Sequence, residues 1–164
     1  MLAPGHIALG LATYAGASYL AGQVPLPELL AAAALGSLLP DIDHPNSQIG
    51  RMLPSISRPV AALIGHRGFT HSLLAVALLT AVLALLAWQQ VESLTAATVI
   101  ALITGYLSHL AGDYLTVRGI PLFWPYRRPG GDYHIPYMAF RTGGPTEILL
   151  TAALGLLLTA LAVY

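Results

Sequence analysis

Three short motifs of this chain, PDIDHP, HRGFTHS and SHLAGD, concentrate histidine and aspartate side chains. In the last motif, His109 and Asp113 are four residues apart on an expected helix, which puts both side chains on one face about 6 Å apart. In the first, Asp41 and Asp43 alternate along an expected extended segment, so both carboxylates point to one side. Imidazole and carboxylate ligands without cysteine favour zinc, or manganese, nickel or iron. These spacings predict a site for a divalent metal.

The middle motif adds His66 and His71, whose separation of five residues does not match one helical face. Gly68 between them predicts a bend, with His66 on a loop and His71 in the first turn of the helix that follows. With His6 and the aspartates this gives about seven candidate ligands, too many for one tetrahedral ion. We therefore expect one or two ions, and two would match hydrolases that clamp the attacking and leaving oxygens between metals.

Apolar helices must position these groups. The chain is 56% hydrophobic and 9% charged, whereas a soluble globular domain carries about 25% charged residues. A membrane crossing needs about 20 mostly apolar residues. Five stretches are interpreted as membrane helices, three long and two shorter: 69–88, 94–113 and 146–164, then 5–22 and 27–39. Small residues in the last of these would let other helices approach closely. The sequence predicts an all-α integral membrane bundle of about five helices, in a single domain over residues 1–164.

The connections between these helices differ in length and charge. Residues 40–68 and 114–144 are long, polar and rich in proline and glycine, and they contain all seven arginines. Because positively charged loops stay on the cytoplasmic side, both long loops and the N-terminus are expected in the cytoplasm and the C-terminus outside. The predicted location is the inner (cytoplasmic) membrane, with several crossings.

This topology brings most ionisable groups to one face of the membrane. The helix ends expected on the cytoplasmic side carry His6, Asp41, Asp43, His44, His66, His71, His109, Asp113 and Glu147. Ionisable groups in a membrane are costly, and by default they mark function. Individual residues keep a structural alternative: Asp41 suits a turn, Thr70-His71-Ser72 suits a plain N-terminal helix cap because Ser and Thr favour that position, and Glu147 suits the acidic first turn of a helix.

In this order among apolar helices, the three motifs resemble a family of bacterial and archaeal inner-membrane proteins described as metal-dependent hydrolases, one branch of which is regulated by the LexA repressor. The resemblance covers nearly the whole chain, from GHIALG to TGGPTEILL. It implies a membrane-embedded, metal-dependent hydrolase. The positions that it implies as metal ligands are His6, Asp41, Asp43, His66, His71, His109 and Asp113. His134, in GGDYHIPY, lies outside the motifs and is at most an accessory group.

The expected chemistry is hydrolysis by metal-activated water at the cytoplasmic face, with zinc as the first choice of metal. A bound divalent ion lowers the pKa of water to about 7, and Asp43 or Glu147 is expected to accept its proton as general base. Arg67 lies between the site histidines, and its guanidinium fork suits a phosphate.

Four of the remaining arginines divide into two groups. Arg127 and Arg128, in FWPYRRPGGDY, are further candidates for phosphate binding, whereas Arg51 and Arg58 are expected to serve topology alone. Cationic loops beside aromatic residues at a lipid surface suggest an anionic amphiphile. We therefore expect membrane lipids as partners and a lipid or lipid-linked phosphoester as substrate, favoured over an amide or an ester.

Other function classes fit less well. A non-enzymatic membrane metal-binding protein or metal transporter is the main alternative, but transport favours ligands near the bilayer midplane and broken helices. The middles of 69–88 and 146–164 hold no ionisable residue. The sequence lacks HExxH, which removes the commonest zinc-protease motif. Zero net charge and the lack of a basic stripe exclude nucleic acid as an expected partner. The oligomeric state is left open.

Overall fold

The computed structural model describes residues 1–64, 67–91, 94–126 and 140–163. Within these ranges the protein is all-α, with two 3-10 helices, η1 (Leu39–Asp43) and η2 (Phe69–His71). The α-helices are α1 (Ala3–Leu20), α2 (Pro27–Gly36), α3 (Gln48–Met52), α4 (Pro54–Ile64), α5 (Leu73–Trp88), α6 (Ala96–Tyr114) and α7 (Pro145–Val163). The predicted all-α class is therefore confirmed for the described residues.

All five predicted helices are present, with shifted ends. The helix expected over 27–39 ends at Gly36, and Pro40 then stands in the first turn of η1, where its fixed φ and missing N–H are tolerated. The helix expected over 69–88 begins at Leu73. The Ser72 hydroxyl accepts a hydrogen bond from the Ala75 N–H at 3.2 Å, so the capping role considered for Ser72 is confirmed.

Two expectations for residues 40–68 are wrong. The segment is not one long loop, because it contains α3 and α4. Ser47 caps α3 by accepting from the Gly50 N–H at 2.9 Å, and Pro54 opens α4, a position where proline suits a helix. The motif around Asp41 is not extended either: it forms η1. Prolines that indicated a loop in the sequence instead begin short helices.

The crossing of α2 and α6 is the closest helix contact in the fold. A Cβ atom added to Gly105 would lie 1.9 Å from the Ala33 carbonyl oxygen, and one added to Gly36 would lie 2.1 Å from the Leu102 carbonyl oxygen. Only glycine permits this approach of two backbones. The prediction that small residues of the second helix allow close packing is confirmed, and the crossing fixes the position of the end of α6 relative to α2.

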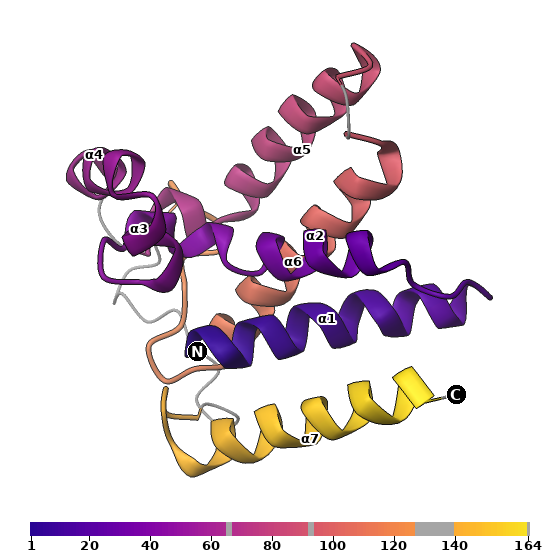
Figure 1. The fold of residues 1–164 in the computed structure, drawn as a ribbon. Helices are drawn as coiled ribbons and strands as arrows, with labels where there is room; N and C mark the ends of the chain where they lie inside the picture. Colours follow the sequence, from indigo (N-terminus) through magenta and orange to yellow (C-terminus); the bar gives the residue numbers. More distant parts are fainter. Residues whose placement is uncertain (65–66, 92–93, 127–139, 164) are drawn as a thin grey trace.

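The other helices surround this crossing (Figure 1). α1 packs against α2 and α6, α7 runs beside α1, and α3 and α4 lie at the end where η1 is found. α5 contacts α6 and extends away from the remaining helices. Large apolar side chains of α5 and α7 are exposed, among them Leu78, Leu149 and Leu156 at 50%, 71% and 74%. Within the described ranges, no helix has both the length and the apolar character needed to cross a membrane.

Candidate metal centre

Four segments deliver six histidine and aspartate side chains to one buried cluster. α1 supplies His6, η1 supplies Asp41 and Asp43, η2 supplies His71, and α6 supplies His109 and Asp113. Five of these residues are at most 1% exposed, and the Asp41 side chain is 19% exposed. Three overlapping sets have ligand atoms within 4.8 Å of one another: His6, Asp41 and His109; His71, His109 and Asp113; Asp41, Asp43 and His71. The structure thus brings together six of the seven predicted ligands, and His66 lies outside the described residues.

His109 is held in one tautomer by the end of α2. Its Nδ1 lies 2.7 Å from the Ser37 carbonyl oxygen, and because a carbonyl only accepts, Nδ1 carries the hydrogen and Nε2 keeps its lone pair. Nε2 has no hydrogen-bond partner among the described residues. It faces Asp41 Oδ1 at 3.8 Å and Asp113 Oδ2 at 3.9 Å. Three acceptors therefore face one another in a buried space, an arrangement that a cation between them would stabilise. A histidine that binds metal commonly donates its other N–H to a carbonyl in this way.

His6 lies directly against this group. Its ring stacks on that of His109, with centroids 3.6 Å apart and an interplanar angle of 8°. His6 Nε2 is 3.3 Å from Asp113 Oδ1, and neither ring nitrogen has a hydrogen bond to a described residue. A Cβ atom on Gly112 would lie 2.7 Å from the Met1 sulfur and 3.2 Å from Leu9 Cδ2, so α6 packs closely on the first turns of α1 beside His6. The spacing of His109 and Asp113 on one face of α6 is confirmed.

Asp43 contacts His71 from the side opposite the cluster centre. Asp43 Oδ2 accepts from the Arg67 backbone N–H at 3.0 Å and from the Thr70 hydroxyl at 2.5 Å, and it lies 3.3 Å from His71 Nδ1. The Tyr106 hydroxyl donates to the Thr70 carbonyl oxygen, which ties η2 to α6. A carboxylate on Nδ1 orients the imidazole so that Nε2 faces the centre. Sequence reasoning missed Thr70 and Tyr106, because their roles depend on contacts between distant segments.

Charges in the cluster shift the pKa values of η1 and η2 residues. Burial lowers the pKa of His71, but hydrogen bonds to Asp41 and Asp43 and the charges of Asp43 and Asp113 outweigh it and raise this pKa to about 9. Burial raises the pKa of Asp41, but the interaction with His71 and the charges of the neighbouring histidines bring it below its usual value. Without metal, a proton on His71 therefore partly offsets the negative charge of the aspartates.

A sequence profile of one family, described as YdjM inner membrane protein, matches residues 1–164. The chain belongs to the YdjM inner membrane protein family. The inner membrane protein YdjM of Escherichia coli (strain K12) is 41% identical over 126 residues, which cover 77% of this chain and 62% of the relative. YdjM of Shigella flexneri matches to the same extent. The uncharacterized protein YvsG of Bacillus subtilis (strain 168) is 38% identical over 120 residues, 73% of this chain and 71% of that protein.

Membership in the YdjM family confirms the inner-membrane family that the three motifs indicated. The chain spans 62% of the length of the two YdjM proteins. No solved structure matches the chain. The family description supports an inner-membrane location and names no reaction.

Arg67 contacts the cluster through its guanidinium, which is already engaged, and its predicted catalytic role stays a prediction. Nη2 pairs with Asp113 Oδ2 at 3.0 Å, and Nη1 donates to the Gly119 carbonyl oxygen at 3.2 Å. The backbone of Arg67 has a positive φ of 60°, a conformation uncommon for a residue with a Cβ atom. In this YdjM-family structure Arg67 therefore holds the side chain of Asp113 in position.

Glu147 makes a different set of contacts. It is 2% exposed at the start of α7, and its carboxylate accepts from the Leu2 N–H at 2.5 Å and the Gly143 N–H at 2.9 Å. Both oxygens thus hold backbone groups around the first turn of α7. The predicted role of Glu147 as general base stays a prediction. His134, Arg127 and Arg128 lie outside the described residues.

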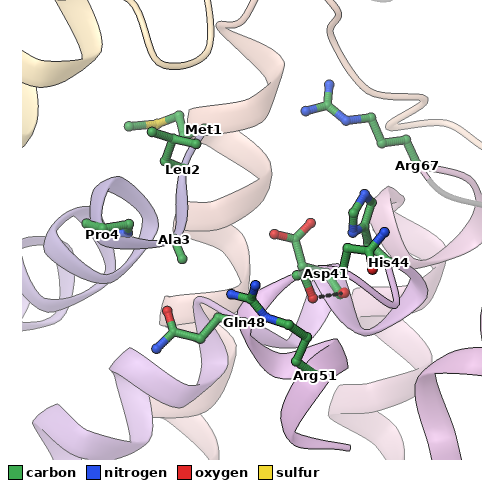
Figure 2. A pocket seen from close by; sticks show the side chains of 11 residues that line it. Met1, Leu2, Ala3, Pro4, Asp41, His44, Gln48, Arg51 and Arg67 are labelled. Atoms are coloured by element: carbon green, nitrogen blue, oxygen red, sulfur yellow. Dashed lines mark hydrogen bonds between the residues drawn. The ribbon is translucent and has the colours of Figure 1, made fainter. Parts of the chain in front are cut away.

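Two cavities border η1. A polar one of about 450 Å³ is lined by Asp41, His44, Arg51 and Arg67, together with residues 1–4 and 46–48 (Figure 2). An apolar one, also about 450 Å³, is lined by Ile42 and by side chains of α4, α5 and α6. The sequence analysis assigned Arg51 to topology alone and did not place it beside the cluster. Its position seven residues after His44 gave no signal, because α3 was not predicted.

Proposed function

We propose that this YdjM-family protein is a membrane-bound, metal-dependent hydrolase that acts at the cytoplasmic face of the inner membrane on a lipid or lipid-linked phosphoester. The observation that carries the proposal is the Nε2 lone pair of His109, buried opposite Asp41 and Asp113 with its tautomer fixed by Ser37. The donor set of imidazole and carboxylate without cysteine suits zinc first, and also manganese, nickel or iron.

Five side chains would hold one or two ions: His6, Asp41, His71, His109 and Asp113. A divalent ion bound there would lower the pKa of water to about 7 and supply a nucleophile at neutral pH. Asp43 would orient His71 through Nδ1, and Arg67 would orient Asp113. Both contacts would keep the ligands fixed while the site changes charge.

The proton acceptor is assigned to Asp41: its Oδ1 faces His71 and His109 as a ligand would, and its Oδ2 is left to accept the proton. Of the aspartates in the cluster, Asp41 has a partly exposed side chain, at 19%, and it borders the polar cavity, so water and substrate can reach it. Asp43, the first choice from the sequence, is fully buried and accepts from Arg67 and Thr70, which suits a positioning role. A general base must lie within hydrogen-bond reach of its proton.

The membrane placement combines the family description with the surface of the helices. We propose that α1, α2, α5, α6 and α7 cross the bilayer, with the arginine-rich segments and the N-terminus in the cytoplasm and the C-terminus outside. The exposed apolar side chains of α5 and α7 would contact lipid. An apolar cavity and a polar cavity on two sides of η1 suit a substrate with an acyl chain and a charged head.

Metal analysis of the detergent-purified protein, followed by assays on lipid phosphoesters, tests this function. The expected result is bound divalent metal in at least stoichiometric amount, with hydrolysis that chelation abolishes and added ion restores. Metal-replete protein that hydrolyses no phosphoester, ester or amide lipid, but moves metal across liposome membranes, would contradict the proposal and favour the transport alternative.

A further inference from the structure

The polar cavity beside the cluster contains two guanidinium groups from different segments. Arg51 comes from α3 and Arg67 from the residues ahead of η2, and Figure 2 shows Asp41 between their side chains. Asn46 and Gln48 line the same cavity with amide groups. The wall of this cavity is therefore rich in hydrogen-bond donors.

The two arginines differ in what they already bind. Both terminal nitrogens of Arg67 are engaged, by Asp113 and by the Gly119 carbonyl oxygen. For the exposed side chain of Arg51, no hydrogen bond or ion pair with any described residue is found. Asp41 Oδ1 faces His71 at 3.6 Å and His109 at 3.8 Å. Arg51 is thus the guanidinium of this cavity whose donors are available to a ligand.

Close packing fixes the backbone of α3, the helix that carries Arg51. A Cβ atom on Gly50 would lie 2.1 Å from the His44 carbonyl oxygen and 2.9 Å from Ser57 Oγ, so α3 packs tightly on the residues that follow η1. Ser47 caps α3 and also donates to the Asp41 carbonyl oxygen at 2.8 Å. The first turn of α3 is therefore anchored to the same segment that supplies Asp41 and Asp43.

From these contacts we infer that Arg51 binds a phosphate group of the substrate in the polar cavity, beside Asp41. The inference rests on the proposed function, and it names Arg51 as the residue that recognises the phosphate of the substrate. A guanidinium presents a planar fork of donors that matches two phosphate oxygens, and the neighbouring amides of Asn46 and Gln48 can donate to a third. The shared chemistry is the phosphate, whether it belongs to a lipid head group or to a soluble phosphoester.

The test titrates inorganic phosphate into the zinc-loaded full chain in detergent, by calorimetry, so that it needs no turnover. Arg51→Ala is expected to weaken phosphate binding by about 10- to 100-fold, the loss typical of hydrogen bonds to a charged group. Arg51→Lys should recover part of the affinity, because it restores the charge without the fork. Arg58→Ala removes an exposed arginine of α4 that does not line the cavity, and it should bind phosphate like the wild type.

Zinc content and thermal stability should be equal in all four proteins. Wild-type phosphate affinity in Arg51→Ala, an equal loss in Arg58→Ala, or zinc-loaded wild-type protein that binds no phosphate would each overturn the inference. Phosphate binding lost in Arg51→Ala, in a protein that hydrolyses nothing, would sustain this inference while the proposed hydrolase function fails. A KM that rises more in Arg51→Ala for a lipid phosphoester in mixed micelles than for a soluble phosphomonoester would place the phosphate on a lipid head group.

Discussion

α6 and α7 have the same length, 19 residues, but they use their side chains differently. α6 buries nine residues, including His109 and Asp113, and its Gly105 brings it against the backbone of α2 and of the residue that follows α2. α7 buries Glu147 among the residues whose burial is described, and it exposes large apolar side chains such as Leu149 and Leu156. How apolar a helix is on average therefore does not show whether it supplies side chains to the site.

The difference shows what holds each helix in place. If the helices lie in lipid, as proposed, there is little hydrophobic driving force between them, so close packing of small residues and buried polar contacts must supply the association. α6 has both, through Gly105 and through the hydrogen bond of His109 to Ser37. α7 has a single buried carboxylate, Glu147, bonded to backbone groups. Substitutions on the two helices should separate metal binding from general stability.

The largest effect is expected when one carboxylate on each helix is replaced by the corresponding amide. Asp113→Asn on α6 should weaken zinc binding by more than about 100-fold, because even partners outside the ligand shell are worth about 10- to 100-fold. Glu147→Gln on α7 should keep zinc and lose thermal stability, since its oxygens bond Leu2 and Gly143. Zinc competition titrations and melting curves measure both. Full stability with lost turnover in Glu147→Gln would instead support its role as general base.

A pair of glycine substitutions tests the packing itself. Gly105→Ala places a Cβ atom 1.9 Å from the Ala33 carbonyl oxygen, and overpacking of this kind costs about 1–3 kcal/mol or more. It should also reduce zinc content, because His109 would move away from Ser37. Gly155→Ala on α7 meets nothing within 4 Å and should stabilise the helix by up to about 1 kcal/mol. Equal effects of the two changes on unfolding would contradict the close crossing of α2 and α6.

Asp43→Asn separates an orienting residue from a ligand. If Asp43 acts by holding His71, the substitution should weaken zinc binding by about 10- to 100-fold and leave saturation attainable at high zinc. Thr70→Val, which removes one donor to Asp43, should have a smaller effect in the same direction. Equilibrium dialysis over a range of zinc concentrations gives the answer. Loss of all binding at any concentration would make Asp43 a ligand, as the motif resemblance implied.

A smaller effect is expected from pH. The pKa of His71 is raised from 6.5 to about 9 in the metal-free protein, so its charged form stabilises the fold fully below pH 6.5, and this stability is lost as the pH rises through 9. Zinc must displace that proton, so its apparent affinity should rise with pH by up to about tenfold per unit. Melting temperatures of the metal-free and zinc-loaded protein between pH 6 and 9 should therefore diverge. Parallel curves would show that His71 does not bind the ion.

The sequence was most informative where the residues of a single segment are enough to determine its structure. The apolar lengths predicted α1, α2, α5, α6 and α7, and the spacing of His109 and Asp113 predicted one face of α6. It was least informative where structure depends on contacts between segments. The prolines at 54 and 59 indicated a loop, although α4 forms there, and the turn around Asp41 is η1, not an extended segment.

The same limit applies to the site. Six ligand candidates could be predicted because histidine and aspartate are rare and costly in apolar helices. The carbonyl of Ser37, the hydroxyl of Thr70 and the guanidinium of Arg51 could not, because nothing local distinguishes them from other polar residues. The glycine-mediated crossing brings Ser37 to the cluster, the contact of Tyr106 with η2 brings Thr70, and the capped first turn of α3 brings Arg51.

The convergence of α1, η1, η2 and α6 on one point has a consequence for the unfolded chain. The protein contains no cysteine, so it cannot form disulfide cross-links. An ion held by His6, Asp41, His71 and His109 would tie together segments from both halves of the chain, and such a tie closes long loops. Closing long loops reduces the entropy of the unfolded ensemble, as a set of covalent bridges does. A bound metal would then act as a reversible cross-link between these segments. The supply of metal in the cell would set the lifetime of the folded protein.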